Sequence, residues 1–150
     1  MDLVTRKLPM HAGEVVTWQL ARMRETAESL AGSGGELAAM GACLSAAVAD
    51  LAEATAWCLK ATADDPRAVA AGCTPYLHMF GLTLGAHLLS KGALAAAETL
   101  RAGTEDEAFL RGRIATARFF AEQLLPRVQG LKPAAMAGAD LLYALEAEDF

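Results

Sequence analysis

Residues 36–61 read ELAAMGACLSAAVADLAEATAWCLKA, and the spacing of the apolar side chains in this stretch decides the fold. These side chains recur at steps of three and four residues, at Leu37, Met40, Leu44, Val48, Leu51, Thr55 and Cys58. Such a period places them all on one face of an α-helix. Glu36 lies in the first turn and Lys60 in the last, where each charge complements the helix dipole. The stretch therefore predicts a long amphipathic helix over residues 36–61.

The segment upstream predicts a helix of the same character over residues 14–31. Its apolar stripe consists of Val16, Leu20, Met23, Ala27 and Leu30. The sequence Gly32-Ser33-Gly34-Gly35 follows, and glycine accepts left-handed geometry while it disfavours continued helix. We therefore expect a tight connection between these two helices. Residues 1–12 have no stable period, which indicates a lead-in segment that precedes a helical domain over residues 13–150.

Downstream, the pattern predicts a third helix over residues 75–101. Asp64-Asp65-Pro66 ends the preceding helix and offers a cap followed by a first-turn proline. Residues 66–74 fit either a single turn or a full helix, and the pattern leaves both open. The third helix is expected to begin with Thr74 as cap and Pro75 at its first position. The alternative is a helix that continues from Pro66, which must kink at Pro75.

Three glycines mark features of this third helix. Gly103 is expected to close it, because a glycine beyond the last turn takes left-handed geometry without strain. Gly81 and Gly85 lie four residues apart, which indicates a groove where another backbone comes close. In a protein outside a membrane, such a groove is expected to serve packing rather than ligand binding.

A fourth helix is predicted over residues 105–130. Thr104-Glu-Asp-Glu107 fits a capping box, in which the threonine hydroxyl accepts from the third amide and Glu107 reaches back. Pro126 should bend the helix or end it near Leu125. The apolar stripe consists of Leu110, Ile114, Ala117, Ala121, Leu124, Val128 and Leu131. From Lys132 onward the pattern weakens to a short helical turn and an acidic tail.

Four helices of comparable length with short connections predict an all-α fold, an antiparallel up-and-down four-helix bundle. Strand-forming residues are scarce and never alternate over a useful window, so a sheet is not expected. The side chains that we expect in its core include Leu20, Leu44, Leu51, Leu84, Ile114 and Leu124.

Composition excludes several classes of function. The net charge of −5 and the absence of a basic stripe exclude nucleic-acid binding. The first eight residues are charged and short of apolar side chains, which does not fit a signal peptide. Cys73–Leu89 is the one membrane candidate, and its histidines and proline favour a buried central helix instead. The chain has three cysteines, and two of them, Cys43 and Cys58, are too far apart on one predicted helix to form a disulfide. This pattern favours free thiols in a reducing cytoplasm.

The candidates for chemistry each fail a geometric test. His78 and His87 fall on opposite faces of one helix, so they cannot share a metal, and a structural role is expected for both. The Gly32–Gly35 stretch joins two helices and lacks the strand and lysine of a phosphate loop. Asp50 and Glu53 near the apolar stripe, like Glu98, fit solvated or paired acids better than a catalytic site. The sequence therefore predicts no catalytic, cofactor-binding or metal-binding residue.

Charged and aromatic residues on the fourth helix indicate the character of its surface. Glu107, Arg111, Arg118 and Glu122 fall near one ridge and predict surface ion pairs. The adjacent Phe119 and Phe120 point about 100° apart, so one of them should face away from the bundle. Because the third helix is also apolar nearly all round, we expect a docking surface near these phenylalanines and the third helix.

Three segments resemble the C-terminus of a branch of the acyl-CoA dehydrogenase family. They are Asp2-Leu-Val-Thr-Arg-Lys-Leu8, Thr74-Pro-Tyr-Leu-His-Met-Phe-Gly81, and the region that runs from Ile114-Ala-Thr-Ala-Arg-Phe-Phe-Ala-Glu-Gln-Leu-Leu-Pro-Arg127 to Phe150. The branch includes the methylmercaptopropionyl-CoA dehydrogenases and carries an extra helical domain after its catalytic core. The three segments occur in the order that the family has and span most of the chain.

The resemblance implies a parent enzyme that uses FAD to oxidise an acyl-CoA to the 2,3-enoyl-CoA. In that family a glutamate, commonly in a Tyr-Glu-Gly-Thr motif, removes the α proton while the flavin accepts the β hydride. This chain has neither that motif nor the sheet and helices that hold FAD, so no catalytic or flavin-contacting residue carries over. What the resemblance implies is a cytoplasmic accessory domain that covers its N-terminal catalytic domains or a subunit interface, in a homo-oligomer. The alternative is a free-standing helical interaction module, and a less favoured third is a bundle that holds an acyl chain between its helices.

Overall fold

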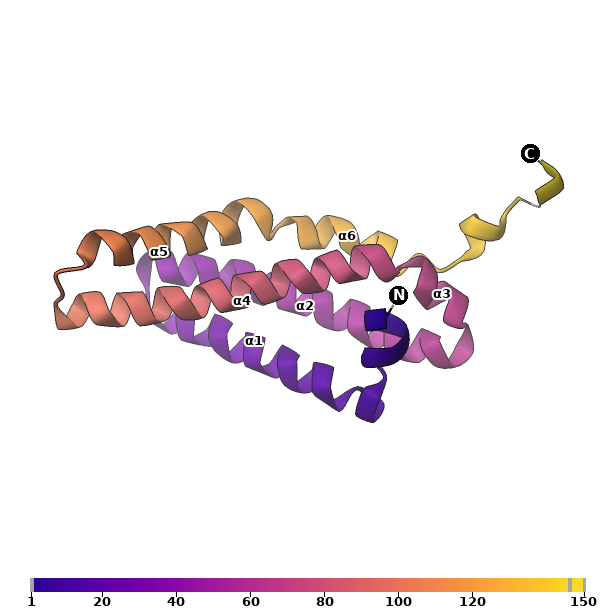
Figure 1. The fold of residues 1–150 in the computed structure, drawn as a ribbon, viewed down its shortest axis with the longest axis horizontal. Coiled ribbons are helices and arrows are strands. Elements are labelled where there is room, and N and C mark those ends of the chain that lie inside the picture. Colours follow the sequence, from indigo (N-terminus) through magenta and orange to yellow (C-terminus); the bar gives the residue numbers. More distant parts are fainter. Residues whose placement is uncertain (1, 146, 150) are drawn as a thin grey trace.

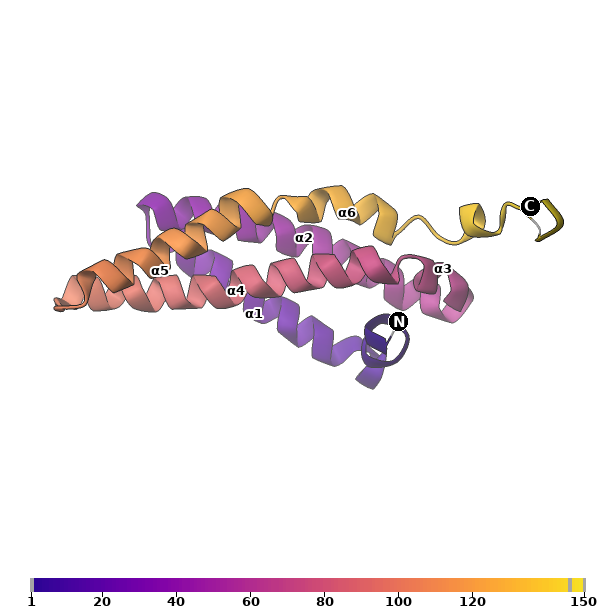
Figure 2. The same cartoon turned by 45° about the horizontal axis from the view of Figure 1, so that its top comes forward.

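The chain is all-α in the computed structural model, which describes residues 2–145 and 147–149. Met1 of the predicted lead-in and Glu146 and Phe150 of the predicted helical domain lie outside the described residues. Figures 1 and 2 show long helices that lie side by side in an elongated body, with a segment near the C-terminus that extends beyond one end. No strand occurs among the described residues.

Helix α1 (Glu14–Gly32) buries the stripe that its sequence predicts. All five residues of that stripe lie in the core. The helix ends at Gly32, and Gly34 and Gly35 take positive φ angles in the connection, as the glycine-rich sequence predicts. Helix α1 packs closely against α2 (Gly35–Asp64), because a Cβ at Gly41 would lie only 2.8 Å from the Ala27 carbonyl oxygen. The absence of a side chain at Gly41 therefore sets the spacing of these two helices.

Helix α2 contacts most of the other helices. It packs against α1 and α4 (Cys73–Ala102), and also against α6 (Arg127–Ala135), and all seven residues of its predicted stripe are buried. The helix ends where Asp65 becomes extended and accepts a 3.0 Å hydrogen bond from the Arg67 amide. Pro66 then begins the short helix α3 (Pro66–Ala71), so the predicted cap and first-turn proline are confirmed and the undecided segment is helical.

The prediction that Thr74 caps the third helix is wrong. Helix α4 begins at Cys73 with Gly72 as its cap residue, and Pro75 lies within the first turn, where its missing amide hydrogen costs no internal hydrogen bond. Gly72 has this role because α6 crosses here, and a Cβ at Gly72 would overlap the Ala135 carbonyl. Gly103, with a φ of 88°, closes α4 as predicted.

The predicted capping box at Thr104 is also wrong. The Thr104 hydroxyl accepts from the Asp106 amide at 3.1 Å, two residues on, and Glu107 binds Arg111 instead of reaching back. Helix α5 (Glu107–Phe119) therefore begins two residues later than predicted.

The fourth predicted helix is divided into three parts. Helix α5 passes into a π-helical turn, η3 (Phe120–Leu124), in which the Leu125 amide donates to the Phe120 carbonyl at 3.0 Å. Pro126 follows, and α6 begins at Arg127. A proline cannot donate a backbone hydrogen bond and its ring crowds the preceding turn, so a widened turn before it accommodates the bend.

Because of this π-helical turn, the prediction that Leu124 lies in the core is wrong. The extra residue in the turn moves Leu125 into the core in place of Leu124, which is only half-buried. Leu84 is likewise half-buried, because the buried face of α4 runs through Met79, Thr83 and Ala86. The other four predicted core residues, Leu20, Leu44, Leu51 and Ile114, are buried.

Residues 3–13 form a π-helical turn, η1 (Leu3–Lys7), and a 3₁₀ turn, η2 (Met10–Gly13). Val4 and Leu8 belong to the hydrophobic core, so this segment is packed against the helical body, at α3 and α4. His11, Ala12 and Gly13 all have positive φ angles, which turns the chain sharply into α1.

The prediction of one membrane candidate at Cys73–Leu89 does not hold. The described helix that is long and apolar enough to cross a membrane, by length and composition alone, is α2. In this fold one face of α2 is buried against α1, α4 and α6, and its opposite face is exposed and carries several alanines, so the buried face and these alanines account for that composition. The cysteines are free thiols, as predicted.

Candidate docking surface

Exposed apolar side chains occur on the adjoining helices α4 and α5. Leu88 on α4 and Phe109 on α5 are 58% and 64% exposed, and Phe119 at the end of α5 is 60% exposed. Leu88 and Phe109 border a hollow of about 380 Å³ between the two helices, with Leu89, Gly112, Arg113 and Thr116 as its other lining residues. We call Leu88, Phe109 and Phe119 the α4–α5 face. Large apolar side chains with this exposure indicate a surface that another protein covers.

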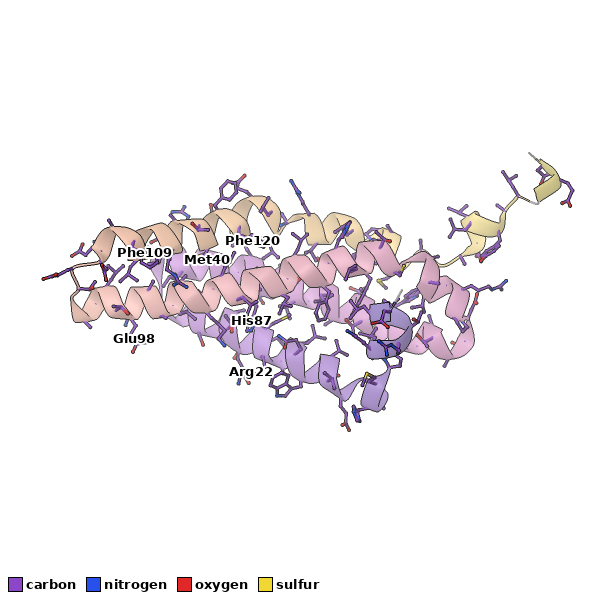
Figure 3. The ribbon with its side chains drawn as sticks, viewed as in Figure 1. Arg22, Met40, His87, Glu98, Phe109 and Phe120 are labelled. Carbon is purple, nitrogen blue, oxygen red and sulfur yellow. The ribbon has the colours of Figure 1, made fainter. Side chains whose placement is uncertain are left out.

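The two adjacent phenylalanines take opposite positions, as their helical spacing predicts. Phe120 (labelled in Figure 3) lies against the core at Gly85, where a Cβ would be 3.1 Å from the Phe120 ring. Phe119, in contrast, is 60% exposed. The predicted close backbone approach at the two α4 glycines is therefore wrong. Gly85 accommodates a phenylalanine ring, and nothing lies within 4 Å of a Cβ built at Gly81.

A cation lies within the apolar face. The Arg113 guanidinium lies 5.9 Å from the centre of the Phe109 ring, and Gly92 leaves the space that it occupies, because a Cβ there would be 2.8 Å from Nη2. Cation–π stacking of this kind holds a long side chain flat over an apolar surface. The α4–α5 face is therefore apolar with one fixed positive charge.

The predicted surface ion pairs on the fourth helix are confirmed. Arg111 contacts Glu107 at 3.1 Å, and Arg118 contacts Glu122 at 2.7 Å and Glu36 of α2 at 3.4 Å. These side chains are largely exposed, so each pair contributes little to stability.

A second hollow lies between α4 and α6. It has a volume of about 700 Å³ and is lined by Leu77, His78, Gly81, Leu82, Arg127, Gly130 and Leu131. We call it the α4–α6 groove. Neither Gly81 nor Gly130 has any atom within 4 Å of its Cβ position, so the groove is open along both helices.

The two histidines of α4 lie apart, as predicted. His78 is exposed at the α4–α6 groove, whereas His87 is buried on the side that faces α1, near Arg22 (Figure 3). The Nδ1 atom of His87 has no hydrogen-bond partner among the described residues. Desolvation, with smaller contributions from Lys91 and Arg22, lowers the pKa of His87 and keeps it neutral.

The acidic candidates are paired or exposed. The Lys132 ammonium lies 2.7 Å from Asp50 and 2.8 Å from Glu53, and these bonds raise its pKa to about 12. The sequence did not reveal this partner, because Lys132 is 79 residues or more from both acids. Glu98 is exposed at the surface of α4 (Figure 3).

The described residues offer little for metal or nucleophilic chemistry. Residues 2–145 and 147–149 contain no group of three or more histidine, cysteine or acidic side chains that could hold a metal ion. Burial raises the pKa of the Cys58 thiol to about 11, which keeps it protonated and unreactive. The surface features that stand out among the described residues are the α4–α5 face and the α4–α6 groove.

Comparison with known proteins agrees with the family resemblance in its second and third segments, whereas the first, Asp2–Leu8, precedes the residues that match the family. Residues 19–146 match the family described as "Acetyl-CoA dehydrogenase C-terminal like". A 3-methylmercaptopropionyl-CoA dehydrogenase of Ruegeria pomeroyi is 34% identical over 131 residues, which cover 83% of this chain and 21% of the relative. The chain thus spans about a fifth of the length of that curated relative. Because the family match extends over most of the chain, this protein belongs to the acetyl-CoA dehydrogenase C-terminal-like family.

Proposed function

We propose that the chain serves as the C-terminal accessory domain of an FAD-dependent acyl-CoA dehydrogenase, with a structural rather than a catalytic role. The parent enzyme would oxidise an acyl-CoA to the 2,3-enoyl-CoA, and this domain would cover part of its N-terminal catalytic domains. Acyl-CoA would then meet the domain only through the parent. The relative in Ruegeria pomeroyi, of which the match covers 21%, leaves ample length for a catalytic region outside the matched part.

The observation that carries this proposal is the α4–α5 face. Leu88, Phe109 and Phe119 expose large apolar surfaces on adjoining helices of a chain that has a well-packed core elsewhere. Burial of such side chains contributes about 1.5–3 kcal/mol each when a partner covers them. A catalytic region with a complementary apolar surface is the partner that the family membership favours.

The residues of this chain do not fit a flavin. The glycine-rich stretch Gly32–Gly35 joins two helices, whereas a dinucleotide cradle needs a strand before its glycines. The hollow between α1 and α2 is lined mainly by alanines, with only Arg24 and Glu28 as charged groups. We therefore assign FAD to the catalytic region and expect the purified chain to be colourless and without dehydrogenase activity. Flavin absorbance that remains after desalting would contradict this assignment.

Three further parts of the proposal concern organisation. We propose that α1, α2, α4 and the rod formed by α5, η3 and α6 make an antiparallel up-and-down bundle, which the short connections favour. The domain boundary between residues 12 and 13 stays a prediction, as does a cytoplasmic location. We also propose that the domain takes part in a homo-oligomer.

The test is binding of the purified chain to the acyl-CoA dehydrogenase catalytic region encoded in the same genome, by titration calorimetry. The double variant Leu88→Ser/Phe109→Ser should weaken binding at least tenfold. Val15→Ser/Trp18→Ser is the matched control, because these α1 side chains are similarly exposed but lie on another helix. Equal binding by both variants would reject the α4–α5 face, and no binding by the unmodified chain would reject the docking role.

The alternative function is a free-standing interaction module that uses the same face without an enzyme. The reading frame upstream of codon 1 distinguishes the two. A frame that continues into a catalytic region supports the accessory domain. A stop codon and a ribosome-binding site directly upstream support the free-standing module.

A further inference from the structure

The segment after α6 carries apolar side chains that the folded body leaves uncovered. Leu141, Leu142, Tyr143 and Leu145 are 60–88% exposed, with Leu141 the most exposed. Both views show this segment leaving the end of the body rather than returning along it (Figures 1 and 2). We call residues 140–145 and 147–149 the arm. An arm with this many exposed leucines indicates that something covers it.

The arm is acidic as well as apolar. Asp140 directly precedes the leucines in the 3₁₀ turn η4 (Asp140–Tyr143), and Glu148 follows them in η5 (Ala147–Asp149). No lysine or arginine occurs between residues 133 and 150. The arm would therefore fit a surface that combines an apolar hollow with positive charge.

The α4–α6 groove has these properties. Its apolar walls are Leu77, Leu82 and Leu131, and Leu77 is half-exposed. Arg127 stands at the groove, and no described carboxylate forms an ion pair with it. The volume of about 700 Å³ falls within the range of sites that bury a sizeable ligand.

The arm of the same chain does not line this groove. The Arg67 guanidinium of α3 lies 5.3 Å from the centre of the Tyr143 ring, so the middle of the arm lies beside α3. The Arg67–Tyr143 contact does not prevent the arm from reaching the groove of a second copy. If two copies exchange arms about a twofold axis, each contact forms twice, and both exposed surfaces of both copies become covered.

We propose that two copies of this chain associate by exchanging arms. Leu141 and Leu142 of one copy enter the α4–α6 groove of the other, and Asp140 pairs with Arg127. This contact uses a different surface from the α4–α5 face. Association of two copies through it does not depend on docking to a catalytic region. Failure of either proposal leaves the other standing.

The test is the mass of the full chain in solution, measured by light scattering after size exclusion over a range of concentrations. The unmodified chain should form a dimer, and Leu141→Ser/Leu142→Ser should be a monomer. Gly130→Leu should also be a monomer, because the added side chain fills the groove. Gly112→Leu is its matched control, since it adds the same side chain to an equally open helical glycine on α5.

Charge reversal tests the polar part of the contact. Arg127→Glu should lower the association constant at least tenfold, and the double variant Arg127→Glu/Asp140→Arg should restore it. A chain that stays monomeric at every concentration, as it would if the arm folded back on its own groove, overturns the proposal. A dimer that persists in both the arm and the Gly130→Leu variants overturns it as well.

Discussion

Tyr76 of α4 donates a 2.8 Å hydrogen bond to the Thr55 hydroxyl of α2 in the middle of the core. The direction follows from the other bond of Thr55, whose hydroxyl donates to the Leu51 carbonyl at 2.7 Å and has no second proton to give. Burial raises the pKa of Tyr76 far above its usual range, so the phenol stays protonated and remains a donor. Tyr76 lies in the Thr74–Gly81 segment that resembles the family, and its role here is to join the two central helices.

Removal of this hydrogen bond should destabilise the fold measurably. Tyr76→Phe should lower the free energy of unfolding by about 1 kcal/mol, and Thr55→Val by about 1–3 kcal/mol because it leaves a buried phenol unpaired. The double variant should cost less than the sum of the two. Urea denaturation of the four proteins checks this, with Tyr143→Phe as the exposed control. Additive losses would show that the two hydroxyls are not coupled.

The π-helical turn predicts which of two adjacent leucines supports the core. Leu125→Ala should lower the free energy of unfolding by about 2–5 kcal/mol, since Leu125 is buried. Leu124→Ala should cost roughly 1 kcal/mol, because its side chain is only half-buried. Leu44→Ala serves as a reference for a fully buried leucine. A larger loss at Leu124 would mean that α5 continues without the widened turn.

Spacing between α1 and α2 makes one glycine substitution unfavourable. Gly41→Ala should destabilise the protein by about 1–3 kcal/mol, because the new methyl group meets backbone atoms of α1. Gly112→Ala should instead stabilise it by about 0.5–1 kcal/mol, since that position is helical and open. Thermal unfolding of both variants checks the opposite signs. Equal shifts would reject the close contact at Gly41.

His87 should make the fold sensitive to acid. The pKa of His87 is lowered in the folded chain from an ordinary value of 6.5. Just below pH 6.5 the imidazole is therefore protonated more often in the unfolded chain than in the folded chain. Stability from this group is therefore complete above about pH 6.5 and falls as the pH drops toward the folded pKa. His87→Gln should flatten the dependence of the unfolding free energy on pH between about 5 and 7.5. The control is His78→Gln, and an equal slope in the His87→Gln variant and the unmodified chain would contradict the assignment.

The sequence alone determined the helical elements and much of their buried surface. The stripes of α1 and α2 lie in the core at every predicted position, because an apolar period of three and four leaves an amphipathic helix only one face to bury. Gly34, Pro66 and Gly103 likewise determined where helices end or begin. The reason is local, because the backbone angles open to glycine and proline do not depend on the rest of the fold. That one of Phe119 and Phe120 faces outward followed from the angle between neighbours on a helix, whereas the structure identifies it as Phe119.

Tertiary structure decided what depends on residues far apart in the chain. Leu125 replaces Leu124 because a widened turn before Pro126 shifts the register, and a stripe drawn with constant period carries no sign of such a turn. The partner of Asp50 is Lys132, which lies on another helix. The close contact at Gly41 and the unpaired His87 likewise depend on which helix lies opposite. Helical periodicity determines on which face of its helix a side chain lies, whereas the residue that it contacts on another helix is determined only by how the helices pack.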